Sequence, residues 1–118
     1  MPQDSLDNLN KRLKVFAQVR DWEQFHNPKN LAMAMIAECA ELVEHFQWLT
    51  PEQSMNLPEK KLQEVALEMA DILLYLIRCA ERLEINLIEA AERKIAINET
   101  RFPINKVYGG AHLASEHE

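Results

Sequence analysis

Apolar residues recur along most of the chain at intervals of three and four residues, which is the spacing of one face of an α-helix. In the first segment the repeat is made by Leu6, Leu9, Leu13, Phe16 and Val19. Similar segments follow, and each is bounded by proline or by a residue that caps helices. The pattern predicts four main helices, over residues 5–25, 31–49, 58–83 and 86–100.

Capping signals mark where these helices begin. Pro28 disfavours helical structure in the residue before it, and Asn30 is a plausible N-cap for the second helix. Thr50 and Gln53 have the spacing of a capping box, with a proline between them, which predicts a short helical turn. Asn86 repeats the capping pattern at the start of the fourth helix.

The end of the fourth helix divides the chain. Pro103 prevents the helix from continuing, and Gly109 and Gly110 lie among small polar residues. We therefore expect a single domain over residues 1–103 and a loose tail over residues 104–118. A length of 118 residues suits one domain, and the presence of only 2 glycines favours long helices over strands and turns. The predicted fold class is all-α, a four-helix bundle.

Acidic residues interrupt the apolar stripe of the second helix. On a helical wheel the stripe places Glu38 among apolar residues and Glu41 at its edge, while Glu44 points away into solvent. The stripe itself consists of Leu31, Met35, Leu42, Phe46 and Leu49.

The third helix repeats this arrangement. Between residues 65 and 77 the only charged residues are Glu68 and Asp71, three positions apart on one face. A helix that is apolar nearly all round is buried nearly all round. We therefore expect both carboxylates to lie in a crevice.

Buried carboxylates require compensation, either by raised pKa values or by a bound cation. Oxygen donors alone suit Mg²⁺ or Mn²⁺, and Mg²⁺ commonly pairs carboxylates with substrate phosphates. The alternative is a solvated helix face, which is the usual role of a single Glu-x-x-Glu pair. A di-iron carboxylate site needs Glu-x-x-His pairs on two helices, and none of these four acids has a histidine three residues later.

Charge and cysteine content exclude some classes of binding partner and cofactor. The formal net charge of -6 does not suit binding to a nucleic-acid polymer, which needs clustered Lys and Arg. Cys39 and Cys79 lie in apolar helical runs and are expected to be buried thiols rather than a zinc or redox motif. We see no signal peptide, and the apolar run over residues 65–77 is too short to span a membrane. A cytoplasmic location is therefore expected.

The motif Glu38-x-x-Glu41, a spacer of 26 residues and Glu68-x-x-Asp71 resembles the all-α nucleoside triphosphate pyrophosphohydrolases of the MazG-like superfamily, and most closely their dCTP pyrophosphatase branch. The resemblance extends from residue 20 to residue 103 and rests further on residues 20–31, 46–48, 71–76 and 94–103. Two positions depart from the family pattern. Phe102 replaces a tyrosine, and Cys39-Ala40 replaces a pair that often contains glycine.

The resemblance implies a hydrolase that cleaves a nucleoside triphosphate, dCTP or another dNTP, to the monophosphate and pyrophosphate. The four acids would hold Mg²⁺, with Mn²⁺ as a possible substitute, and Glu41 would be the base that activates water. Lys94 would stabilise the leaving pyrophosphate. The other implied substrate-binding residues are Trp22, His26, Asn30, Trp48 and Tyr75 around the base and sugar, and Arg82, Asn98 and Arg101 beside Lys94 near the phosphates.

Family members are dimers or dimers of dimers, so the resemblance also implies a homo-oligomer, with a tetramer favoured over a dimer. Its biological role would be the removal of unwanted deoxynucleotides. Two alternatives remain open from the sequence. One is a non-catalytic helical interaction module that needs no acids, and the other is an enzyme acting on another phosphoanhydride.

Overall fold

The computed structural model of the chain describes residues 5–110, and within this range every regular element is a helix. The chain divides into two compact units, Met1–Glu84 and Ile85–Glu118. The first unit contains α1 (Leu6–Val19), α2 (Pro28–Glu44), α3 (Pro51–Ser54) and α4 (Glu59–Arg82), and the second contains α5 (Leu87–Arg101) and α6 (Ile104–Val107).

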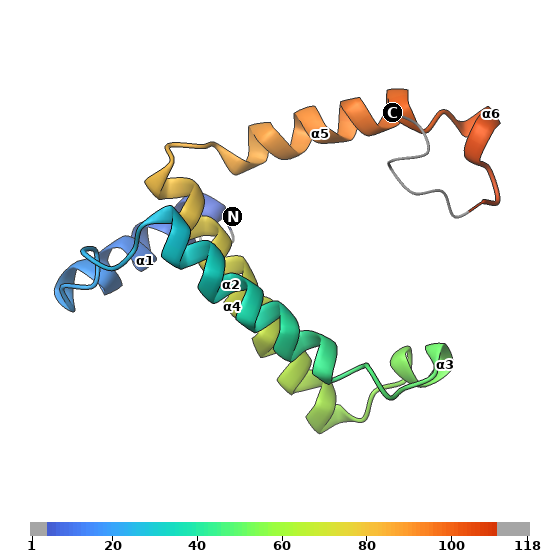
Figure 1. The fold of residues 1–118 in the computed structure, drawn as a ribbon, viewed down its shortest axis with the longest axis horizontal. Helices are drawn as coiled ribbons and strands as arrows, with labels where there is room; N and C mark the ends of the chain where they lie inside the picture. Colours follow the sequence, from blue (N-terminus) through green and yellow to red (C-terminus); the bar gives the residue numbers. More distant parts are fainter. Residues whose placement is uncertain (1–4, 111–118) are drawn as a thin grey trace. The chain divides into compact units, whose positions relative to one another are not determined.

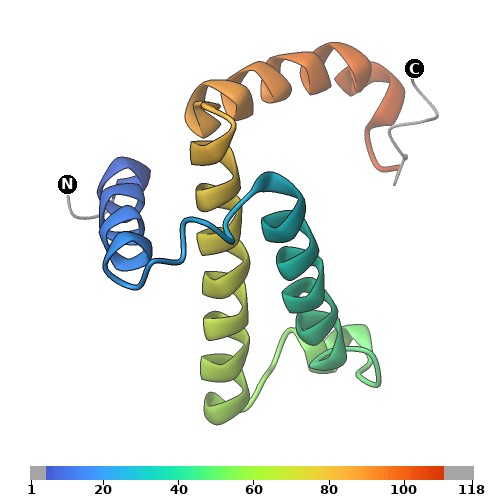
Figure 2. The same cartoon turned by 60° about the vertical axis from the view of Figure 1, so that its left-hand side comes forward.

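The first unit is built on the packing of α2 against α4, which lie side by side in Figures 1 and 2. Leu31 of α2 is buried, as are Val65, Ile77 and Ala80 of α4. These small and branched side chains form the core of the unit, because packing an apolar stripe against another helix is what stabilises a helix of this length.

α1 packs against α4 through apolar and polar side chains. Ala17 is buried, and Nδ2 of Asn10 donates a hydrogen bond of 2.7 Å to Oε2 of Glu81. Lys14 lies 3.6 Å from the other carboxylate oxygen of Glu81. The hydrogen bond from Asn10 is the largest of the causes that lower the pKa of Glu81. Glu81 therefore links α1 to the last turn of α4.

The four main helices are present, but the first connection differs from the prediction. α1 ends at Val19 rather than at residue 25, and Asp21 adopts a left-handed backbone with φ of 54°. α2 starts at Pro28, so the predicted cap Asn30 is wrong. The side chain of Asn27 caps the helix instead by accepting a hydrogen bond from the backbone N–H of Asn30. The reason is that proline fits the first helical position, where no N–H is needed.

Other capping predictions are confirmed. Thr50 and Gln53 form the reciprocal capping box, with hydrogen bonds of 3.1 and 2.9 Å. Asn86 caps α5 by accepting a hydrogen bond from the backbone N–H of Glu89. α2 ends at Glu44, five residues before the predicted end, and the chain continues in turns to Thr50.

The second unit contains a further short helix inside the expected tail, and the loose tail over residues 104–118 stays a prediction. α5 ends at Arg101, and after Pro103 the chain forms the short helix α6. The remaining tail residues, 111–118, lie outside the described residues. Since a division into compact units does not decide whether each unit folds independently, the single domain over residues 1–103 stays a prediction.

The expectation that the third helix is buried nearly all round is wrong for the chain by itself. Asp71 is exposed, and Leu67 is 70% exposed. The cysteines are free and half-buried rather than buried. One face of α2 and one face of α4 carry exposed apolar side chains at helical spacing, and we call these the apolar faces: Met33, Ile36 and Val43, and Leu62, Met69, Leu73 and Leu76.

Among the described residues, none of the helices has the length and hydropathy that crossing a membrane would require.

Candidate functional site

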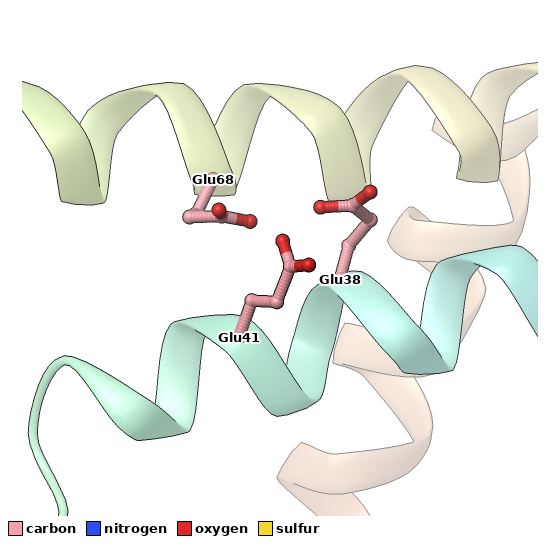
Figure 3. Close-up of side chains that lie close together, drawn as sticks. All are labelled: Glu38, Glu41 and Glu68. Atoms are coloured by element: carbon pink, nitrogen blue, oxygen red, sulfur yellow. The ribbon is translucent and has the colours of Figure 1, made fainter.

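Three carboxylates converge between α2 and α4. Glu38 and Glu41 come from α2 and Glu68 comes from α4, and Figure 3 shows their side chains pointing toward one another across the gap between the helices. One carboxylate oxygen from each residue lies within 4.8 Å of the other two. The spacing of three residues on α2 places Glu38 and Glu41 on the side that meets Glu68.

Mutual repulsion and burial favour the protonated forms of this cluster. The hydrogen bond with Glu68 is the largest cause that raises the pKa of Glu38, to about 7, and Glu41 and partial burial add to it. Burial is the largest cause that raises the pKa of Glu68. Without a proton or a cation, the three negative charges destabilise one another.

The donor set fits a hard divalent cation. Oε2 of Glu68 is buried, and among residues 5–110 it finds no hydrogen-bond donor while its neighbours are ionised, because a carboxylate can only accept. The cluster contains oxygen ligands and no sulfur or nitrogen, which suits Mg²⁺ or Mn²⁺. These residues can therefore hold the metal that the sequence suggested.

Asp71 is not part of this cluster of three. It follows Glu68 by one helical turn, and its exposed side chain lines a neighbouring pocket. The pocket has a volume of about 190 Å³ and lies between α1, the loop after it and α4. It is lined by Leu13, Phe16, Ala17, Trp22, His26, Asp71, Leu74, Tyr75 and Arg78.

Aromatic rings form one wall of this pocket. The ring of Trp22 meets Phe16 edge-on, with centroids 5.6 Å apart, and lies 6.2 Å from the ring of His26. Trp22 is 44% exposed, so part of its surface is available to another ring. The volume is below the roughly 300–1,000 Å³ of sites that enclose a whole drug-sized ligand. The pocket therefore suits a single heterocycle.

Polar groups that make no hydrogen bond among the described residues line the same pocket. Arg78 is only 3% exposed, and its three guanidinium nitrogens make no hydrogen bond within the described part of the chain. The nearest counter-charge is Oε1 of Glu23, at 3.7 Å from Nη2. Nδ1 of His26 is also buried and unpaired among the residues that the structure describes. Burial is the largest cause that lowers the pKa of His26, and the charges of Arg78 and Arg82 add to it.

The predicted substrate-binding residues of the first unit separate into two groups. The structure brings Trp22, His26 and Tyr75 together in the pocket. Asn30 lies apart from the pocket lining, and its side-chain amide donates to the backbone carbonyl of Phe25. Trp48 lies in the turns after α2 and is 87% exposed.

The remaining predicted residues lie at the end of α4 and on α5. Arg82 is the last residue of α4 and is exposed. Lys94 is exposed on α5, Asn98 is half-buried, and the guanidinium carbon of Arg101 lies 5.6 Å from the centre of the Phe102 ring. The second unit is not placed relative to the first, so the roles of Lys94, Asn98 and Arg101 stay predictions.

Sequence reasoning missed Arg78. The signal was available, because Arg78 is a lone charge in the apolar run that follows Asp71, and it lies seven residues after Asp71 on the same helix face. Tyr75 occupies the position between them on that face. Leu13 and Leu74 also line the pocket. Their spacing in the sequence does not distinguish pocket-lining residues from ordinary core residues.

Comparison with known proteins assigns the class. Residues 33–111 match the model of the MazG-like family, and the chain belongs to that family. A crystal structure of a pyrophosphatase from Archaeoglobus fulgidus superimposes with a TM-score of 0.78 at 40% sequence identity, covering 82% of this chain and 91% of that one.

Within the family, the chain lies on the dCTP pyrophosphatase branch. It is 38% identical to human dCTP pyrophosphatase 1 over 96% of this chain, and 35% identical to the mouse protein over 93%. The chain spans only 64% and 66%, respectively, of the lengths of these two relatives.

Proposed function

We propose that this chain is a magnesium-dependent nucleoside triphosphate pyrophosphohydrolase that converts dCTP or another dNTP to the monophosphate and pyrophosphate. The observation that carries the proposal is the pairing of two sites on α4: a carboxylate cluster at Glu68 and an aromatic pocket, joined by Asp71. The names of the relatives support the same reaction.

The acids supply the reacting end of the site. Glu38, Glu41 and Glu68 would hold Mg²⁺ or Mn²⁺, and Asp71 would be a fourth ligand. A bound metal would neutralise phosphate charge and make the attacking water more acidic. Glu41 accepts the proton of the attacking water. The oxygen of this water bonds to the phosphorus of the α-phosphate. The bond from this phosphorus to the oxygen that bridges to the β-phosphate breaks, and pyrophosphate is released.

The other predicted residues bind the substrate. Trp22, His26 and Tyr75 hold the base and sugar, since aromatic faces stack on any base. Asn30, Trp48 and Arg82 lie outside the pocket lining and would approach the substrate from its edges. In the assembled enzyme Lys94, Asn98 and Arg101 meet the phosphates, where Lys94 stabilises the charge on the leaving group.

We propose further that the active form is a homo-oligomer, a tetramer rather than a dimer, in which pairs of helices from different copies complete four-helix bundles. The apolar faces support this proposal, because exposed apolar side chains at helical spacing on two adjacent helices are typical of an interaction surface. The role would be the removal of surplus deoxynucleotides in the cytoplasm.

The test is a panel of dNTPs and NTPs with Mg²⁺ or with EDTA, with products identified as monophosphate and pyrophosphate. We expect metal-dependent release of pyrophosphate, abolished by Glu38→Gln and retained by Glu44→Gln, which changes an exposed acid of the same helix. Turnover of none of these nucleotides would favour a non-catalytic interaction module instead.

A further inference from the structure

Arg78 has more hydrogen-bonding capacity than residues 5–110 use. A guanidinium has five N–H donors in a planar fork. The guanidinium of Arg78 is almost fully buried, lines the pocket and finds no acceptor among residues 5–110. Buried donors that lack hydrogen bonds are costly in free energy, even beside a counter-charge. This arrangement is the one expected of a group whose acceptors arrive with a ligand.

The pocket end of α4 lies far from the carboxylate cluster. At a rise of about 1.5 Å per residue, the ten residues from Glu68 to Arg78 span roughly 15 Å. A triphosphate attracted to a metal at Glu38, Glu41 and Glu68 would therefore lie away from Arg78. The aromatic pocket around Trp22 meets the opposite end of the nucleotide, which is the base.

The arginine is not alone at this position. Glu23 follows the pocket residue Trp22 in the chain, and its Oε1 forms an ion pair with Nη2 of Arg78 at 3.7 Å, too long for a hydrogen bond. Together they offer two donors beside an acceptor. Cytosine carries the complementary edge, with acceptors at N3 and O2 and a donor amine at C4. Uracil and thymine have a donor, N3–H, and an acceptor, O4, at these positions. They therefore cannot accept from Arg78 at N3 or donate to Glu23 at C4.

We infer that Arg78 and Glu23 are the residues that select the base, with Arg78 donating to N3 and O2 of cytosine and Glu23 accepting from its amine. This inference rests on the proposed function and names the substrate class as cytosine nucleotides. Asn30 does not supply these contacts, because its side-chain amide already donates to the backbone carbonyl of Phe25.

The decisive measurement is selectivity between dCTP and dUTP, which differ only at this edge. Arg78→Met retains an unbranched aliphatic stem and removes the N–H donors of the guanidinium. Loss of a bidentate contact lowers kcat/KM for dCTP by about 10- to 100-fold, while kcat/KM for dUTP changes little. Glu23→Gln supplies both an acceptor and a donor, and raises the use of dUTP relative to dCTP. Arg12→Met, which changes an exposed arginine of α1, leaves both values unchanged.

A purely structural role for Arg78 gives a different result, with equal losses for dCTP and dUTP and a lowered melting temperature. That result overturns the inference, as does an unchanged ratio in both variants. If Arg78→Met does not fold, Arg78→Lys and Glu23→Gln decide, since a lysine keeps the charge but cannot form the paired contact.

A binding measurement separates this inference from the proposed function. Calorimetry with dCMP and dUMP, without metal, is expected to detect tighter binding of dCMP, lost in Arg78→Met. A wild-type protein that hydrolyses no dNTP but binds dCMP in this way refutes the proposed function and supports the base-selection inference. Active wild-type protein that does not distinguish dCMP from dUMP refutes the inference alone.

Discussion

Glu38 of α2 and Glu68 of α4 face each other between their helices, and their hydrogen bond is the largest cause that raises the pKa of Glu38 to about 7. Two carboxyl groups from different helices thus share a proton near neutral pH. This relationship links the stability of the metal-free protein to its ability to bind a cation, since both depend on the charge at one place.

The metal-free protein is expected to lose stability as pH rises. A carboxyl group whose folded-state pKa is raised from 4.5 to about 7 contributes stability that is fully present below pH 4.5 and is lost as pH rises through 7. Urea unfolding in EDTA across this range should show the loss in wild type and a weaker one in Glu38→Gln. Glu44→Gln should behave as wild type. A stability that rises equally in all three proteins would refute the shared proton.

Divalent metal should reverse this destabilisation. Mg²⁺ binding to the folded state at 100 times its dissociation constant adds about 2.7 kcal/mol. Because the metal displaces a proton from the cluster, the shift in melting temperature should be larger at pH 8 than at pH 5.5. Glu68→Gln should lose most of the shift, and Glu44→Gln should keep it. An equal shift in wild type and Glu68→Gln would place the metal elsewhere.

Loss of the aromatic wall should weaken binding of every nucleotide alike. Stacking on an aromatic side chain is worth about 1–3 kcal/mol per base, so Trp22→Leu should raise KM by roughly 5- to 100-fold with little change in the ratio between bases. Steady-state kinetics on four dNTPs tests this. A KM raised equally for all bases in Trp22→Leu, with a loss confined to dCTP in Arg78→Met, would show that different residues provide affinity and base selection. A change of base preference in Trp22→Leu would contradict the stacking role of Trp22.

The link between α1 and α4 should be measurable as a coupling energy. A double-mutant cycle of Asn10→Ala and Glu81→Ala is expected to give about 1 kcal/mol, typical of one partly exposed hydrogen bond. The lowered pKa of Glu81 stabilises the fold above pH 4.5, and this contribution is lost as pH falls below it. The coupling should therefore shrink at pH 3.5. A cycle with no coupling at pH 7 would show that α1 docks without this hydrogen bond.

The apolar faces predict a change of assembly on substitution. Ile36 is 69% exposed in the isolated chain, so Ile36→Glu should not disturb the fold of one chain but should disrupt an oligomer built on this face. Light scattering after gel filtration measures the mass. Gln47→Glu introduces the same charge at an exposed position just after α2 and should keep the wild-type mass. An unchanged oligomer in Ile36→Glu would place the interface elsewhere.

The sequence by itself determined the helices and the chemistry of the acids. Apolar spacing located the four main helices, and capping patterns at Thr50 and Asn86 were confirmed because caps depend on local backbone geometry. The spacing of Glu38, Glu41 and Glu68 placed them on inward faces of their helices, which is also a local property.

Only the tertiary structure decided how these faces meet. It separated Asp71 from the cluster of three and placed it at the pocket, and it brought Glu23 from the loop after α1 to Arg78 of α4. Helical periodicity gives the direction of a side chain from its own axis but not the neighbour it meets, since that depends on the packing of helices remote in sequence. The polar pocket therefore could not be recognised from the sequence, because its residues come from three segments that only folding brings together.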